Sequence, residues 1–88
     1  MENHLTLSSL AQSGFHNIQK AILELLGENP QGLGNSEIAD ILGLKTGLDG
    51  RQKDYLTWSI LQDLVHQKIL IRTARPNSKR QLIYQLSR

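Results

Sequence analysis

The sequence predicts one small, mainly α-helical domain that ends in a β-hairpin. Apolar residues recur at helical spacing in three segments between residues 16 and 67, and two short apolar runs, at 69–73 and 81–86, flank a Pro-Asn-Ser turn. A chain of 88 residues holds a single modest core, which needs almost every apolar side chain. That leaves little room for an enclosed active site.

The first helix is expected in "HNIQKAILELLGEN", residues 16–29. Five apolar residues there fall at i, i+3, i+4, i+7 and i+8, which is one stripe of an amphipathic helix: Ile18, Ala21, Ile22, Leu25 and Leu26. Pro30 requires the helix to end before it. Residues 1–14, with Leu5, Leu7 and Leu10, are expected to be a flexible N-terminal tail or a short accessory element, and residues 15–88 the domain.

The second helix is expected in "NSEIADILGL", residues 35–44, after a turn or very short strand centred on Leu33. Its Asn-Ser start supplies a cap, and Glu37 lies in the first turn, where a carboxylate favours the helix dipole. Three apolar residues are expected to face inward, namely Ile38, Ile41 and Leu42. Gly43 is placed for a C-terminal cap.

The third helix is expected from Gly50 to about Gln67, with Asp49 as its N-cap and Gln52 three positions on. At about 100° per residue, the inward arc contains Leu56, Thr57, Ile60, Leu61, Leu64 and Val65. Tyr55 lies opposite this arc, and Trp58 lies on its margin. Tyr55 is thus expected to face outward, whereas Trp58 either contacts a ligand or wedges between helix and hairpin.

The hairpin is expected to close the core with alternate residues of its two strands. The core-facing set is Leu82, Tyr84 and Leu86, with Ile69 and Ile71 on the partner strand. The connecting turn lies within "ARPNSKR", residues 74–80, and is basic.

Composition excludes several classes of function. The chain has no cysteine, and its three histidines, His4, His16 and His66, lack the spacing of a zinc site. The N-terminus lacks a basic leader followed by an apolar run, and no stretch approaches the roughly 20 apolar residues that span a bilayer. The expectation is therefore a cytoplasmic protein with no membrane partner, no metal, no cofactor and no enzymatic activity.

Charge is distributed unevenly along the chain. Residues 1–50 carry a net −4, and residues 64–88 carry six cations with no carboxylate, within a total of +2. Clustered cations bind polyanions because they release the counterions condensed on phosphates. The simpler alternative is that these charges only solvate a short C-terminal segment.

Together, "IQKAILELL", "NSEIADILGL" and "LQDLVHQKILIR" resemble the three helices and wing entry of winged helix-turn-helix DNA-binding domains, over about residues 15–88. Lys68 stands where many members have glycine. A weaker resemblance, over residues 32–64, is to winged-helix segments associated with type II restriction endonucleases, although this chain has no nuclease cluster of carboxylates and lysine.

The resemblance implies a three-helix core with a two- or three-stranded antiparallel wing, and duplex DNA as the partner. It places five positions of the third helix in or beside the major groove: Arg51, Gln52, Lys53, Tyr55 and Thr57 or Trp58. It places wing-tip residues on phosphates or in the minor groove: Arg75, Asn77, Ser78, Lys79 and Arg80. The loop "LKTGLDG" is longer than the usual helix-turn-helix turn, so the groove-facing positions are less firmly assigned than the fold.

The leading hypothesis is sequence-specific or general duplex-DNA binding, in transcription regulation or DNA targeting. The alternative is a protein-interaction module, a homodimer or complex subunit that uses the same scaffold without DNA. RNA or left-handed DNA is a third hypothesis, but the wing lacks the tryptophan and paired prolines typical of left-handed-DNA binders of this fold.

Overall fold

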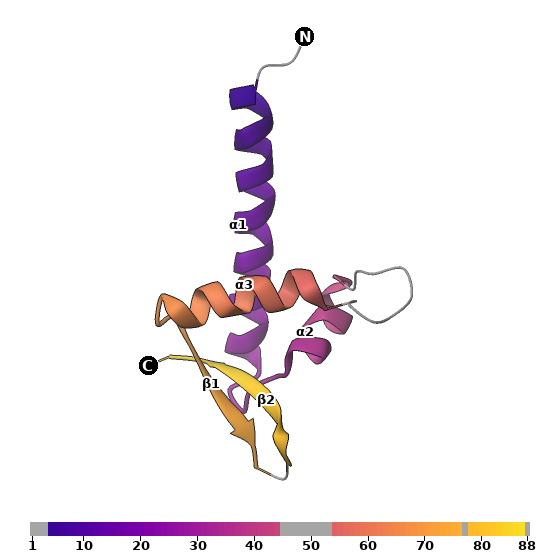
Figure 1. Ribbon diagram of the computed structural model, residues 1–88, viewed down its shortest axis with the longest axis vertical. Coiled ribbons are helices and arrows are strands. Elements are labelled where there is room, and N and C mark those ends of the chain that lie inside the picture. Colours follow the sequence, from indigo (N-terminus) through magenta and orange to yellow (C-terminus); the bar gives the residue numbers. More distant parts are fainter. Residues whose placement is uncertain (1–3, 45–53, 77, 88) are drawn as a thin grey trace.

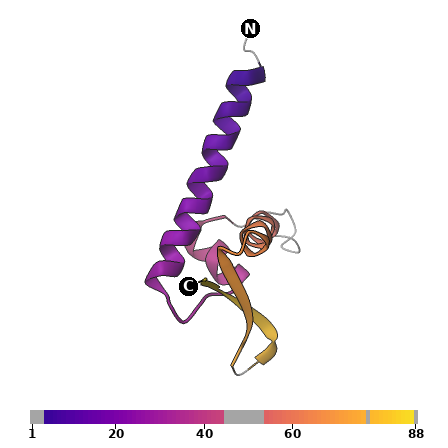
Figure 2. The ribbon, with the colours of Figure 1, turned by 90° about the vertical axis from the view of Figure 1, so that its left-hand side faces the viewer.

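The computed structural model of the protein describes residues 4–44, 54–76 and 78–87. Within them the elements are α1 (His4–Glu28), α2 (Asn35–Leu42), α3 (Tyr55–His66), β1 (Leu70–Arg75) and β2 (Ser78–Leu86). The two strands form an antiparallel hairpin at the opposite end of the molecule from the N-terminus (Figures 1 and 2). The predicted class, three helices and a hairpin, is confirmed.

Helix α1 is longer than predicted. The sequence analysis began it at His16, but it begins at His4 and runs for 25 residues, through the boundary placed after residue 14. Ser8, Ser9 and Gly14 weaken helix propensity there, but no proline interrupts the segment. Residues 4–17 are exposed, and the buried residues of α1, Ile22 and Leu26, lie in its C-terminal half. The N-terminal half therefore projects from the body (Figure 2).

Helix α2 confirms the predicted C-terminal cap and corrects one inward residue. Gly43 adopts φ 70°, and the N–H groups of Gly43 and Leu44 donate to Asp40 O (3.3 Å) and Ala39 O (2.8 Å). These two bonds form a Schellman motif. Ile38 and Ala39 are buried, but Ile41 is 57% exposed, because the core reaches only one narrow face of this short helix. Gly34, rather than Asn35, occupies the N-cap position.

Helix α3 begins at Tyr55 rather than Gly50, with Asp54 in the N-cap position. The predicted cap at Asp49 and its partner Gln52 lie outside the described residues. The buried face has the predicted orientation and consists of Thr57, Ile60, Leu61 and Leu64. Leu56 and Val65, at the edges of the predicted arc, are only partly covered.

The junction between α3 and β1 corrects the predicted facing of the hairpin. Lys68 adopts φ 66° and ends α3 with a second Schellman pattern, in which the N–H groups of Lys68 and Ile69 donate to Val65 O (2.9 Å) and Leu64 O (3.0 Å). Strand β1 then begins at Leu70, which is buried, while Ile69 and Ile71 are exposed. Because side chains alternate along a strand, this one-residue offset turns the predicted pair outward.

The two strands of the hairpin pair in a defined register. Leu70 pairs with Leu86 and Arg72 with Tyr84, with an irregularity between Ala74 and Arg75. Tyr84 is buried and Leu86 partly so, as predicted. Leu82 is 44% exposed, because β2 enters the core only after it, at Ile83 and Tyr84. The predicted short strand at Leu33 is an isolated bridge to Tyr84, closed by two backbone hydrogen bonds.

One hydrophobic core joins all the elements. Its buried residues are Ile22, Leu26, Leu33, Ile38, Ile60, Leu61, Leu64, Leu70 and Tyr84. Among the helices that the structure describes, none combines the length and apolar character needed to cross a membrane.

Candidate nucleic-acid interface

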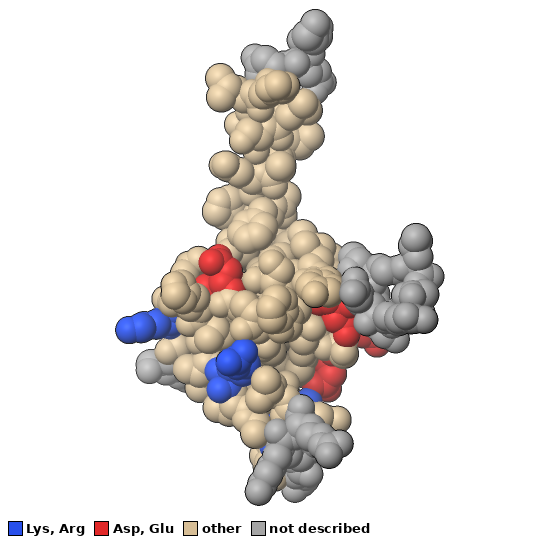
Figure 3. Space-filling model, viewed as in Figure 1, with Lys and Arg blue, Asp and Glu red and all other residues tan. Residues whose placement is uncertain are grey.

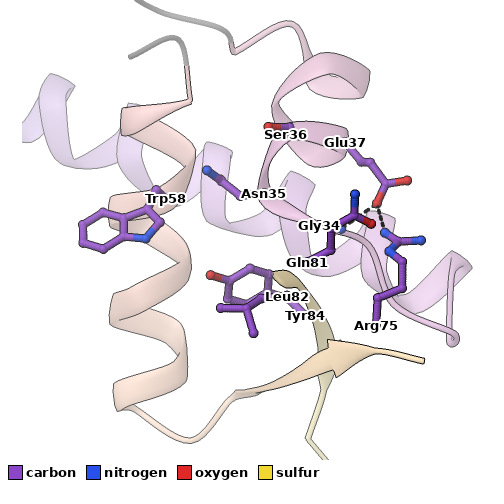
Figure 4. A pocket seen from close by; sticks show the side chains of 9 residues that line it. All are labelled: Gly34, Asn35, Ser36, Glu37, Trp58, Arg75, Gln81, Leu82 and Tyr84. Carbon is purple, nitrogen blue, oxygen red and sulfur yellow. Dashed lines mark hydrogen bonds and ion pairs between the residues drawn. The ribbon is translucent and has the colours of Figure 1, made fainter. Parts of the chain in front are cut away.

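The N-terminus of α2, the exposed side of α3 and the hairpin surround a hollow of about 540 Å³. Its lining includes Asn35 of α2, Trp58 of α3, and Arg75, Leu82 and Tyr84 of the hairpin (Figure 4). Segments that are up to 50 residues apart in the chain thus form one concave surface. In the described chain, no group of three or more His, Asp or Glu side chains is arranged to hold a metal ion.

The start of α3 is fixed against the start of α2. Asn35 Nδ2 donates to the backbone oxygen of Asp54 (3.2 Å), and the hydroxyl of Ser36 donates to the Asp54 carboxylate. The same Asp54 backbone oxygen accepts the N–H of Trp58 (2.9 Å), the first turn of α3. These contacts hold the first turn of α3 against α2, while the apolar side of α3 faces the core.

The outward side of α3 presents an aromatic pair. Tyr55 is 58% and Trp58 is 47% exposed, and their rings meet edge to face with centroids 6.1 Å apart and an interplanar angle of 77°. The prediction for Tyr55 is confirmed as to its outward orientation, and Trp58 combines an exposed ring with a place in the lining of the hollow. Thr57, which was offered as an alternative to Trp58 for groove contact, is fully buried and faces the core.

A hydrogen-bonded chain connects α3 to both strands. Gln62 Nε2 donates to the Tyr84 hydroxyl (2.8 Å), and Arg72 Nη1 donates to Gln62 Oε1 (2.8 Å). Both ends of the Gln62 amide are therefore engaged. This network was missed in the sequence, because its partners lie 10 and 22 residues apart and no local pattern links them.

Arg75, a predicted phosphate contact, forms an ion pair with Glu37. The same Glu37 Oε1 accepts the N–H of Gly34 (2.8 Å), so one carboxylate oxygen joins the start of α2 to the end of β1 (Figure 4). A Cβ at Gly34 would lie 3.3 Å from this oxygen and 3.3 Å from Leu82 O, so a side chain there would crowd both oxygens. The predicted dipole role of Glu37 did not reveal this pairing across 38 residues.

The remaining residues predicted to contact DNA lie in the segments 51–53 and 77–80. Arg51, Gln52, Lys53 and Asn77 lie outside the described residues. Ser78, Lys79 and Arg80 are the first three residues of β2. Their assignment to DNA therefore stays a prediction.

Positive and negative side chains lie over different elements of the surface. On the face in Figure 3, cationic side chains lie over the hairpin and the end of α3, and carboxylates lie around α2 and along α3. The projecting half of α1 shows neither, since residues 4–19 contain no Lys, Arg, Asp or Glu. The hairpin is thus the cationic part of the body, and the projecting half of α1 is an arm without charged side chains.

Solved structures with a similar arrangement are bacterial regulators. A ZitR mutant from Lactococcus lactis in the apo form aligns over 94% of this chain and 57% of its own, at 24% identity and a TM-score of 0.66. A MepR mutant from S. aureus, bound to an oligodeoxyribonucleotide, aligns over 99% and 67%, at 17% identity and a TM-score of 0.66. A probable transcriptional regulator from Pseudomonas aeruginosa aligns over 98% and 67%, at 15% identity and a TM-score of 0.62.

These likenesses concern the fold. A second ZitR mutant structure aligns over 81% of this chain and 42% of its own, so the chain spans about half the length of the ZitR structures it matches. No family model matches the sequence, and no curated protein sequence does.

Proposed function

We propose that this winged helix-turn-helix chain is a non-enzymatic protein that binds duplex DNA, in transcription regulation or DNA targeting. In this proposal α3 enters the major groove, and the hairpin contacts the backbone or the minor groove. The observation that carries it is the exposed side of α3, which lies beside a hairpin that holds most of the excess positive charge.

The dimensions and charges of the two parts suit a duplex. The 12 residues of α3 correspond to about 18 Å of helix, and the major groove is about 12 Å wide. Four of the six cations after Leu64 belong to the two strands of the hairpin, namely Arg72, Arg75, Lys79 and Arg80. Cationic side chains are the usual contacts of phosphates along a groove edge. Arg51, Gln52, Lys53, Tyr55 and Trp58 are proposed for the groove, and Arg75 to Arg80 for the backbone.

The test is the salt dependence of binding to a labelled duplex. If five or six phosphates are neutralised, the slope of log K against log salt is about −5, and affinity falls by about 10³ between 50 and 200 mM salt. The double variant Lys79→Ala with Arg80→Ala should weaken binding about equally on all sequences and make the slope shallower by about 2. Absence of binding to any duplex at low salt would refute the proposal.

Lys20→Ala is the matched control for these variants. Lys20 lies on the exposed side of α1, outside the hollow between α2, α3 and the hairpin. Lys20→Ala removes one positive charge, and the double hairpin variant removes two. We expect Lys20→Ala to leave the salt slope unchanged. A slope that becomes shallower by about 1 in Lys20→Ala would indicate a general charge effect.

The projecting half of α1 supports a second proposal, that the chain self-associates. Leu7, Leu10 and Phe15 are exposed on the side of α1 that continues the stripe of Ile18 and Ile22 into the core. A helix with one apolar face and no partner is marginal in water. Because residues 4–19 carry no formal charge, two copies can pack there without like-charge repulsion. A homodimer would bring two DNA-binding surfaces together.

A further inference from the structure

We propose that the aromatic pair Tyr55 and Trp58 recognises the C5 methyl groups of thymines in the major groove. This inference rests on the proposed binding of duplex DNA and adds the chemical group that α3 would recognise. It follows from what the outward side of α3 offers and from what it lacks.

The described part of α3 lacks cationic side chains. Between Tyr55 and His66 the sequence contains no Lys or Arg, and its one acidic residue is Asp63. The commonest base-specific contact, a bidentate Arg or Lys on the O6 and N7 atoms of guanine, is therefore not available from these residues. Affinity for phosphates would come from the hairpin, and recognition by α3 needs other chemistry.

The amide suited to adenine is already engaged. A glutamine recognises adenine by presenting its oxygen and its nitrogen together to the base edge. Gln62 uses its nitrogen on the Tyr84 hydroxyl and its oxygen on Arg72, both at 2.8 Å. Adenine recognition would break two hydrogen bonds that connect α3 to the hairpin, so Gln62 positions α3 instead.

Apart from the hydroxyl of Ser59, the outward side of α3 offers mainly aromatic surface. Tyr55 and Trp58 expose about half of each side chain, and their edge-to-face contact holds both rings on one side of α3. In the major groove, the thymine methyl is the one apolar group on a base edge, and apolar side chains contact it. An exposed aromatic pair therefore fits thymine better than it fits the polar edges of the other bases.

Among the described residues, the surroundings of Trp58 contain no unpaired charge. Trp58 lines the hollow with Leu82 and Tyr84 and with the polar residues Asn35, Ser36 and Gln81 (Figure 4). The two charged residues of the lining, Glu37 and Arg75, are paired with each other. A methyl group beside Trp58 would thus find its apolar contact on the aromatic ring itself, with no unpaired charged residue in the described lining of the hollow.

The experiment compares thymine with deoxyuridine, which lacks the C5 methyl group and keeps the same base pairing. Duplexes are first selected from a random library, and the best one is then prepared with every thymine replaced by deoxyuridine. We expect the affinity to fall about fourfold for each contacted methyl, as for one buried methyl group. The salt slope should not change, because the phosphate contacts are the same.

Variants assign the effect to the aromatic pair. Trp58→Ala and Tyr55→Ala should each lower the ratio of thymine to deoxyuridine affinity toward one, whereas Trp58→Phe and Tyr55→Phe should retain much of it. Ser59→Ala, on the same exposed side of α3, is the control that should leave the ratio unchanged. The ratio is measured on one protein sample, so partial unfolding of a variant does not alter it.

Each outcome bears on one proposal or both. Salt-dependent binding with equal affinity for the two duplexes would overturn methyl recognition and leave duplex binding intact. A ratio above one that Trp58→Ala and Tyr55→Ala both leave unchanged would also overturn it, because other residues would then read the methyl. Absence of binding to any duplex would overturn both proposals.

Discussion

Thr57 is the polar residue in the otherwise apolar buried side of α3. It is fully buried, and its hydroxyl has no hydrogen-bond partner among the described residues. A buried hydroxyl without a partner lowers stability by about 1–3 kcal/mol. Valine has nearly the same shape without the polar atom. The position therefore tests whether this side of α3 serves only the core.

Thr57→Val should raise the free energy of unfolding by about 1 kcal/mol, because it removes the unpaired hydroxyl and retains the volume. Urea unfolding monitored by circular dichroism measures the change. The control is Ser59→Val, on the exposed side of the same helix, for which no comparable gain is expected. A loss of stability in Thr57→Val would mean that the hydroxyl has a partner in the folded chain.

The ion pair between Arg75 and Glu37 involves a cation that is proposed to contact DNA. Glu37→Gln keeps an oxygen for the Gly34 N–H but removes the negative charge. We expect tighter duplex binding and a salt slope steeper by about 0.9, because Arg75 then becomes available to a phosphate. Glu24→Gln removes the same charge from an exposed position on α1 and should leave the slope unchanged. An unchanged slope in Glu37→Gln would place Arg75 outside the interface.

At the scale of elements, α2 and α3 end in the same backbone motif, formed by a glycine in α2 and by a lysine after α3. Both C-terminal caps are Schellman motifs with a residue of positive φ, Gly43 at 70° and Lys68 at 66°. Glycine adopts this conformation freely, whereas a residue with a Cβ is disfavoured there by about 1 kcal/mol. The resemblance to winged helices indicated glycine at the position of Lys68, and the backbone explains why.

The two caps make a matched pair of substitutions. Lys68→Gly should raise the midpoint of thermal unfolding, and Gly43→Ala should lower it, each by an amount equivalent to about 1 kcal/mol. At Gly43 an added Cβ would meet no heavy atom within 4 Å, so its effect is purely conformational. Lys68→Ala is the control for loss of the lysine side chain. Equal midpoints for Lys68→Gly and Lys68→Ala would contradict this account.

The elements also show what the sequence could and could not predict. Helix α2, its cap at Gly43 and the buried side of α3 follow from local spacing, and all three are confirmed. The facing of β1 was wrong, because the turn at Lys68 shifts the alternation by one residue. The ion pair of Glu37 and the network of Gln62 depend on contacts between distant segments, which periodicity does not encode.

At the scale of the whole molecule, a compact body carries a projecting arm. The chain measures 54 by 35 by 21 Å, and the long dimension follows α1. The arm exposes leucine and phenylalanine side chains to solvent, whereas the buried part of α1 begins near Ile22. Self-association through α1 would cover this arm and leave the hollow by α3 open.

Analytical ultracentrifugation at several concentrations should detect a dimer whose population falls in Leu10→Glu, because two carboxylates would meet in the apolar contact. Leu10 is 70% exposed, so the substitution should leave the body folded. Ser9→Glu places the same charge on the opposite side of α1 and should leave the dimer intact. A monomer at every concentration for the natural sequence would refute self-association.

The contacts on either side of residues 45–53 have an evolutionary consequence. The chain is fastened before this segment by the bond from Leu44 to Ala39 and after it by the bonds of Asp54 to Asn35 and Ser36. These hydrogen bonds involve no residue of 45–53, so they do not depend on which side chains that segment carries. We therefore expect that the residues proposed for the groove at Arg51 to Lys53 can change while α2 and α3 keep their relative positions.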